Sequence, residues 1–419
     1  MGQTLKDRIR QDILTRYSNI LVKEGVSKEE LGGMIRHIIE SIINRPRSPL
    51  GEEDKKKITE ELVDEFVGLG PIEKLMQDPA VTEIMINGPN KIYFEANGKK
   101  KLFETDFGNE SQVMRFIQKI LAPTRRRVDE SYPYTDVSLE DGSRINIIIP
   151  PLALDGPTVT VRKFLKTIKT VEDLIKADTM DRRMADFLVA CIKAKANIMF
   201  TGATGAGKTT TLGILSSYIN SEDRIVTIED TAELHLAQEH VVRLEARQPN
   251  IEGKGGVTIK DLFNNSLRMR PERIILGEIR GVEALDMLQA ICSGHVGSLS
   301  VLHANSPQDA IYRLETIILA SGVPINLDAL HRQIAAAINV IVQQEQLMDG
   351  SRKITHITQV NGLKDGRVVL EDIFVYDIEG VDAGEKIHGR WKATGVTPVF
   401  TSLFKKEGIK IAQEIFNKD

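Results

Sequence analysis

A glycine-rich segment, GATGAGKT from Gly202 to Thr209, carries residue types that could bind phosphate. It fits the pattern G-x-x-x-x-G-K-[ST] and lies between an apolar strand, ANIMF, and a helix, TTLGILSSYI, as that pattern requires. Glycines let the backbone curl so that its N–H groups point inward, and the helix start adds a positive dipole end. The alternative is an accidental match in a glycine-rich helix cap, and the flanking strand and helix argue against it.

Two side chains of this segment have separate expected roles. Lys208 should reach the β- and γ-phosphates of ATP, and Thr209 should place its hydroxyl on Mg²⁺. We therefore expect ATP and Mg²⁺ as ligands. The residues expected to contact the nucleotide are Gly202, Ala203, Thr204, Gly205, Ala206, Gly207, Lys208, Thr209 and Thr210.

Acidic residues follow two further apolar runs. The strand RIVTI ends in EDTAEL, which places Glu229, Asp230 and Glu233 at the carboxyl edge of a sheet, where carboxylates can orient water. The run RIIL ends at Glu278, a candidate Walker B acid that acts on Mg²⁺ through a bound water or polarises the attacking water. For each of these acids, the alternative is a solvated charge at a strand end.

Histidines and arginines complete the candidate set. His295 and His303 flank the run LSVL and could sense the γ-phosphate, although single histidines are usually core or surface residues. Upstream, Arg127, Arg144 and Arg162 could neutralise charge on the phosphates, because a guanidinium group binds oxyanions with two donors. The alternative is that these arginines are solvated surface charge.

The patterning predicts how the chain is organised around these residues. Apolar residues at helical spacing predict a small helical bundle over residues 1–68. Alternating runs predict an α+β domain over 69–164, with hairpins at Asn97-Gly98 and at Asp141-Gly142. A polar linker follows over 165–180. Over 181–419, strands alternate with helices, as in the parallel sheet of an α/β domain.

The composition excludes several classes of protein. The 419 residues are 41% hydrophobic and 27% charged, as in ordinary globular proteins. A net charge of −4 gives no general attraction to nucleic acid, so no nucleic-acid partner is expected. The two cysteines form no disulfide framework. The charged N-terminal segment and the lack of a long apolar run predict a cytoplasmic protein without a lipid anchor.

The order of the motifs is itself informative: GATGAGKT, EDTAEL, LRMRPERIILGEIRG and SGHVGSLSVLHANS. It resembles the secretion-ATPase superfamily of type II secretion, type IV pili and type IV secretion. Within it, the phrases INIIIPPLALDGPTVTVRKF and ALDMLQAICSGHVGSLSVLHANSPQDA look like the CpaF-type ATPases of tight-adherence (Flp/Tad) pili. Thr231, where pilus-retraction relatives often have proline, favours the same branch, and the cysteine module of some relatives is absent, so no zinc is expected.

The resemblance implies a RecA-like motor domain, an N-terminal PAS-like domain that closes over the nucleotide, and a homohexameric ring. It implies Glu233 as general base, Glu278 as Walker B acid, His295 and His303 as the His box, and arginines that reach ATP from the N-terminal domain. The implied role is a motor for assembly, possibly also retraction, of a pilus through inner-membrane platform proteins, which would hold it peripherally at that membrane. The alternative is a type IV secretion ATPase that drives protein or DNA export.

Overall fold

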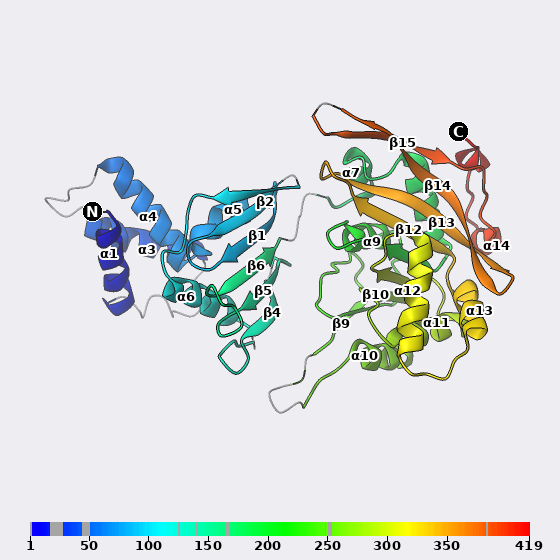
Figure 1. Cartoon of the computed structure of the whole chain (residues 1–419), viewed down its shortest axis with the longest axis horizontal. Coiled ribbons are helices and arrows are strands. Elements are labelled where there is room, and N and C mark those ends of the chain that lie inside the picture. The colour runs from blue at the N-terminus through cyan, green and yellow to red at the C-terminus, as the bar shows by residue number, and fades with distance from the viewer. Residues whose placement is uncertain are drawn as a thin grey trace. The chain divides into compact units, whose positions relative to one another are not determined.

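The computed structural model describes residues 2–16, 28–43, 51–96, 98–124, 126–139, 141–163, 168–247, 249, 254–382 and 384–419. They form two compact units, Met1–Leu165 and Lys166–Asp419 (Figure 1). The helical bundle and the α+β domain expected from the sequence both lie in the first unit.

The first unit begins with three helices, α1 (Gly2–Arg16), α3 (Lys28–Ile43) and α4 (Glu52–Phe66). Their apolar faces pack together around Ile9, Ile13, Ile35 and Ile39, which confirms the helical spacing read from the sequence. The end of α4 is joined to the rest of the unit by Lys119 of α6 (Glu110–Leu121). The Lys119 Nζ donates to three carbonyl oxygens there, those of residues 65, 66 and 68. Carbonyls at a helix end lack partners within the helix, so this lysine caps α4.

A six-stranded antiparallel sheet forms the rest of the first unit, in the order β3-β2-β1-β6-β5-β4. Alternate residues such as Ile84, Ile86 and Val159 are buried on one face, where α6 packs. The hairpins expected near residues 97 and 141 are present as β2–β3 and β4–β5, with Asn97 itself outside the described residues. The elements are β1 (Val81–Asn87), β2 (Ile92–Ala96), β3 (Lys99–Phe103), β4 (Tyr134–Ser138), β5 (Arg144–Ile148), β6 (Thr158–Arg162), η1 (Gly70–Ile72) and α5 (Glu73–Gln77).

The second unit is built on a nine-stranded sheet in the order β15-β14-β13-β12-β7-β11-β10-β8-β9. Neighbours from β12 to β9 are parallel, and β13 to β15 extend the sheet by antiparallel hairpins. The α/β class expected from the sequence is therefore correct. The strands are β7 (Ile198–Thr201), β8 (Ile225–Glu229), β9 (Val241–Glu245), β10 (Arg273–Leu276), β11 (Leu299–Leu302), β12 (Val340–Gln346), β13 (Arg352–Lys364), β14 (Arg367–Val381) and β15 (Ile387–Ala393).

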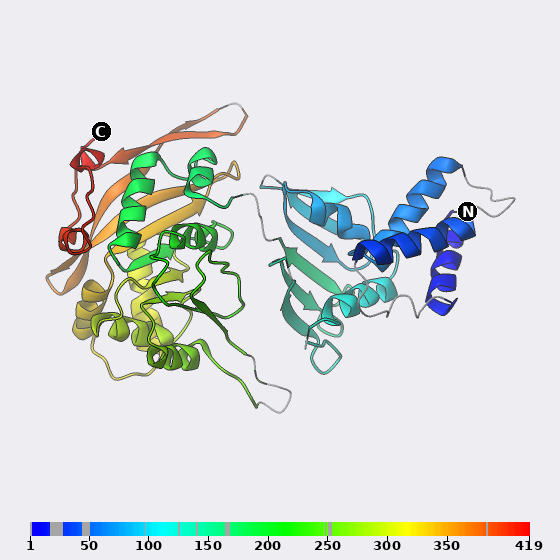
Figure 2. The same cartoon turned by 180° about the vertical axis from the view of Figure 1, so that it is seen from behind.

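Helices cover both faces of this sheet (Figures 1 and 2). Consecutive strand residues point to opposite faces, so in β7 Ile198 and Phe200 join one core while Met199 joins the other. One core includes α7 (Val171–Lys176), α8 (Arg182–Lys193), α9 (Lys208–Ser216), α14 (Thr401–Lys406) and η3 (Gln413–Phe416). The other includes α10 (Ile259–Ser266), η2 (Leu267–Met269), α11 (Glu283–Cys292), α12 (Pro307–Ala320) and α13 (Leu327–Ala337). Among the described residues, none of the helices has the length and apolar character needed to cross a membrane.

Candidate active site

The glycine-rich loop has the geometry of a phosphate-binding loop. It connects the fully buried strand β7 to α9, whose first residue is Lys208. Gly207 precedes the helix with φ +95°, a left-handed conformation that favours glycine. Position 202 also requires glycine, because a Cβ there would lie 2.0 Å from the carbonyl oxygen of Gln344 in β12. The loop thus has its inner side at the start of α9, where N–H groups and the helix dipole favour an anion.

Lys208 is 5% exposed and lies within this loop. Its Nζ donates to the carbonyl oxygen of Ala203 at 2.7 Å and lies 3.5 Å from Nδ1 of His303. The lysine therefore bridges the two ends of the loop and faces the residue that follows β11. Thr209, the next residue along α9, is half-buried, and Thr210 is exposed.

Four parallel strands bring charged side chains to one edge of the sheet. The strands β7, β11, β10 and β8 are neighbours, and their carboxyl ends lead to Lys208, His303, Glu278 and Asp230 in that order. Ligands of open α/β sheets bind at this edge. The strand order therefore puts Glu278 and Asp230, which the sequence predicts at strand ends, at one edge of the sheet.

The charged groups at this edge form a continuous network. Glu278 Oε1 lies 3.1 Å from His303 Nε2, and Glu278 Oε2 lies 2.8 Å from the Arg280 guanidinium. The same guanidinium reaches Asp230 Oδ2 at 3.1 Å. With Lys208 beside His303, the network connects all four strand ends.

Glu278 is ionised in this network. Burial by itself raises its pKa, but hydrogen bonds from His303 and Arg280, and the charge of Arg280, outweigh burial and hold the pKa at about 2. The carboxylate is therefore available near neutral pH to act on a metal shell or on water, as the sequence reading of a Walker B acid requires.

The three acids at the carboxyl end of β8, Glu229, Asp230 and Glu233, lie in different environments. Glu229 is 3% exposed, and its Oε1 accepts the backbone N–H groups of Glu233 and Leu234 at 2.9 and 3.0 Å. Burial raises the pKa of Glu229 in spite of these bonds. In this conformation Glu229 anchors the acidic loop. Glu233 is half-exposed, and its backbone N–H donates to Glu229 at the end of β8, so it lies at the same edge. The hydrogen bond with Glu278, together with the charges of Glu278, Asp230 and Glu233, raises the pKa of Arg280.

His295 lies away from this network. It precedes β11, whereas His303 follows it, so the two histidines lie at opposite edges of the sheet. The His295 ring lies near the carbonyl oxygen of Ala290 at the end of α11, with Nδ1 at 3.3 Å. Within one chain, His295 is therefore not brought to the phosphate loop.

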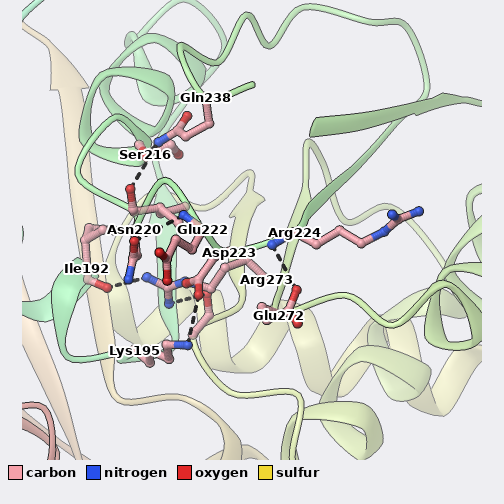
Figure 3. A network of polar contacts seen from close by, with 12 residues as sticks. Ile192, Lys195, Ser216, Asn220, Glu222, Asp223, Arg224, Gln238, Glu272 and Arg273 are labelled. Atoms are coloured by element: carbon pink, nitrogen blue, oxygen red, sulfur yellow. Dashed lines mark hydrogen bonds and ion pairs between the residues drawn. The ribbon is translucent and has the colours of Figure 1, made fainter. Parts of the chain in front are cut away.

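The opposite edge has a structural network of its own, centred on Arg273 (Figure 3). The Arg273 side chain is 1% exposed and pairs with Asp223, which also pairs with Lys195. The guanidinium donates to the carbonyl oxygens of Ile192 and Gly297. These groups belong to the segments that enter β7, β8, β10 and β11. The network therefore fixes the amino ends of the four strands whose carboxyl ends carry the candidate site.

The arginines predicted upstream lie in the first unit. Arg144 of β5 and Arg162 of β6 are register partners, so their side chains lie side by side on one face of the sheet. Glu83 of β1 is the register partner of Arg162 on its other side. Arg127 is exposed and lies 3.7 Å from Asp129. The structure thus brings Arg144 and Arg162 to each other and leaves Arg127 apart in a loop.

Comparison with known proteins shows the family to which the chain belongs. A family described as "Type II/IV secretion system protein" matches residues 65–398. This chain belongs to that family. Relatives include a putative conjugal transfer protein of Mycobacterium tuberculosis strain H37Rv, 31% identical and covering 78% of this chain and 94% of that protein. Protein VirB11 of Agrobacterium fabrum is 30% identical, covering 65% of this chain and 87% of that protein.

Two solved structures are also similar to this member of the family. The VirB11 ATPase from the Brucella suis type IV secretion system, solved with sulphate, is 26% identical, with 69% of this chain and 92% of that chain covered and a TM-score of 0.38. The pilus retraction motor PilT with bound ADP is 19% identical, with coverages of 72% and 80% and a TM-score of 0.48.

Three residues of the site were not identified from the sequence. Arg280 stands two positions after Glu278, a spacing that puts both side chains on one side of an extended segment, and this signal was available. Gln344 and Arg352 touch the phosphate loop from more than 140 positions away in the chain. No local pattern marks them.

Proposed function

We propose that this chain hydrolyses ATP at the carboxyl edge of its parallel sheet. The observation that carries the proposal is the network of Lys208, His303, Glu278 and Arg280 beside the phosphate loop. A triphosphate on the loop would attract Lys208 away from the carbonyl oxygen of Ala203, because two ionised phosphates bind an ammonium group more strongly than a neutral carbonyl does.

The residues present fit a magnesium ion. Among the described residues, no group of three or more His, Cys, Asp or Glu side chains could hold a metal alone, and magnesium typically takes one or two carboxylates together with substrate phosphates and water. The Thr209 hydroxyl at the start of α9 and the ionised Glu278 are the groups that would hold it, Glu278 through a water. When bound, magnesium supplies positive charge that stabilises the phosphate oxygens during transfer.

Hydrolysis would then proceed by attack of water on the γ-phosphorus. The new P–O bond forms as the bond to the β–γ bridging oxygen breaks, and ADP leaves with that electron pair. Glu233, half-exposed at the same edge, is proposed as the base that accepts the proton of the water. Glu229 is a less suitable base here because its Oε1 already accepts two backbone N–H groups. His303 is proposed to contact the γ-phosphate, and its position between Lys208 and Glu278 supports this role.

We further propose that the second unit is a RecA-like motor domain and that the first is a PAS-like domain over a helical bundle. The motor would work as a homohexamer in the cytoplasm, peripherally at an inner membrane, and would power assembly of a Flp/Tad pilus through platform proteins. Arg144 and Arg162, adjacent on one sheet face, would reach ATP from the first unit and stabilise the γ-phosphoryl charge. We also propose that His295 acts with His303 as the His box and that Arg127 helps to neutralise charge on the phosphates.

A type IV secretion role is the second candidate. It is favoured by relatives whose names include conjugal transfer and type IV secretion system proteins. Both candidates share the ATPase site, so a cellular experiment separates them. Deleting the gene should abolish surface pili visible by electron microscopy, and a Lys208→Ala gene should fail to restore them. Normal piliation together with loss of protein or DNA export would favour the second candidate.

A further inference from the structure

The outer side of the phosphate loop rests on a wall formed by β12 and β13. A Cβ at Gly202 would lie 2.0 Å from the Gln344 carbonyl oxygen, and a Cβ at Gly207 would lie 2.9 Å from Gln344 Nε2 and 3.3 Å from Arg352 Cδ. Both ends of the loop therefore lie close to Gln344, and the end at Gly207 also lies close to Arg352. This wall comes from a part of the chain with no phosphate-binding motif.

The pairing of β12 with β13 is irregular at this wall. The register of β12 against β13 shifts between Gln343 and Gln344, as in a β-bulge. Both glutamines are buried, at 0% and 2% exposure, as expected for a strand that is covered on both faces. Bulges occur next to active sites, where they redirect a side chain. Here the bulge lies at Gln344, and the parallel pairing of β12 with β7, with Gln343 opposite Thr201, places Gln344 against Gly202 of the phosphate loop.

Arg352 makes the polar contact of the wall with the loop. Its Nε donates to the carbonyl oxygen of Gly205 at 2.9 Å, across 147 positions of sequence. Gly205 has φ +82°, so the loop is in a left-handed conformation where the arginine holds it. A carbonyl directed outward to Arg352 leaves the N–H groups of the loop free to point inward, which is the arrangement that a phosphate requires.

We propose that Arg352 is a positioning residue that holds the phosphate loop in its nucleotide-binding conformation, with Gln344 as the packing support at the bulge. The proposal rests on the proposed function in assuming that the loop binds nucleotide. Arg352 acts on the loop through the carbonyl oxygen of Gly205, so its effect does not depend on a γ-phosphate. Loss of Arg352 should therefore weaken the binding of ADP and of ATP by the same factor and leave the rate of the chemical step unchanged.

The test compares Arg352→Met with the parent in the full-length protein. Methionine keeps an apolar stem beside Gly207 and removes the donor, so the fold should be retained and the nucleotide-free melting temperature should fall by no more than a few degrees. We expect the dissociation constants of a fluorescent ADP and of a non-hydrolysable ATP analogue to rise by the same factor of about ten, as for loss of one charged hydrogen bond. The KM for ATP should rise with kcat unchanged, the signature of lost uniform binding. Arg352→Lys keeps the charge without a donor at the Nε position and should recover only part of the affinity.

Controls separate this proposal from the function on which it rests. Arg390 of β15 is an exposed arginine paired with Glu379 at 2.8 Å, and Arg390→Met should bind both nucleotides as the parent does. Parental ADP affinity in Arg352→Met would overturn the proposal. Weaker binding of the ATP analogue with parental ADP binding would also overturn it, as would parental affinity for both nucleotides in Arg352→Lys. Parental nucleotide affinity in Lys208→Ala would instead refute the phosphate-loop assignment itself.

Discussion

Arg280 joins two acid-bearing loops of the site, and replacing it by alanine tests the geometry directly. In Arg280→Ala, Glu278 loses a 2.8 Å ion pair and Asp230 loses one of 3.1 Å. The Glu278 side chain is 20% exposed and that of Arg280 is 53% exposed. Surface pairs contribute roughly 0–1 kcal/mol, whereas breaking a fully buried pair costs about 3–5 kcal/mol. The Arg280 pairs lie between these limits. Without this stabilisation Glu278 and Asp230 lose their common partner and shift, and misplacement of a catalytic group by about 1 Å costs about 10²-fold in rate. We therefore expect a roughly 30-fold lower kcat, equivalent to about 2 kcal/mol of transition-state stabilisation.

The assay is steady-state phosphate release at saturating MgATP. Arg280→Lys should not restore the rate, because an ammonium group lacks the planar fork that reaches two carboxylates at once. Arg390→Ala is the matched control, since Arg390 is 63% exposed and also makes a 2.8 Å ion pair, far along the chain from the site. A kcat for Arg280→Ala within twofold of the parent would refute the role given to the network.

Three further predictions address the remaining parts of the site. Lys208→Ala should weaken ADP and ATP binding by about 100-fold in fluorescence titration, because two charge-assisted hydrogen bonds are lost; unchanged affinity would contradict the loop assignment. Burial raises the pKa of Glu229, so ionisation of this carboxyl lowers the free energy of unfolding. This loss of stability is absent below the ordinary pKa of glutamate and grows as the pH rises through the pKa that Glu229 has in the folded protein. The melting temperature of Glu229→Gln minus that of the parent should therefore increase from pH 4 to pH 8. A difference that stays the same across this range would refute the prediction. Arg144→Ala and Arg162→Ala should each lower turnover severalfold and leave assembly measured by light scattering intact; parental turnover in both would remove the clamp role.

The sequence predicts the local parts of the site well. The phosphate loop follows from eight consecutive residues and their flanking strand and helix, and Glu278 follows from an apolar run that ends in an acid. Both depend on backbone geometry over a short span, which one sequence carries. The helical spacing in α1 and α3 is predictable for the same reason, because it reports directly which face is buried.

The parts of the site that depend on strand order are harder to predict from the sequence. His295 and His303 look equivalent as residues flanking one apolar run, but the two ends of a four-residue strand lie at opposite edges of the sheet. Gln344 lies beside the loop because β12 pairs with β7, and Arg352 reaches the loop from β13, which pairs with β12 on its other side. Such contacts come from tertiary pairing and leave no periodic signal in either segment.

The most direct test of the account is phosphate release by Glu278→Gln. Glutamine keeps the size of the side chain but lacks the negative charge that the site holds at neutral pH, where the pKa of Glu278 is about 2. The account predicts that Glu278→Gln binds ATP with an affinity within a few-fold of the parent and hydrolyses it at least about 100-fold more slowly, since general-base or metal-shell roles contribute about 10²–10⁴-fold. Turnover by Glu278→Gln at the parental rate would show that hydrolysis does not occur at this edge of the sheet.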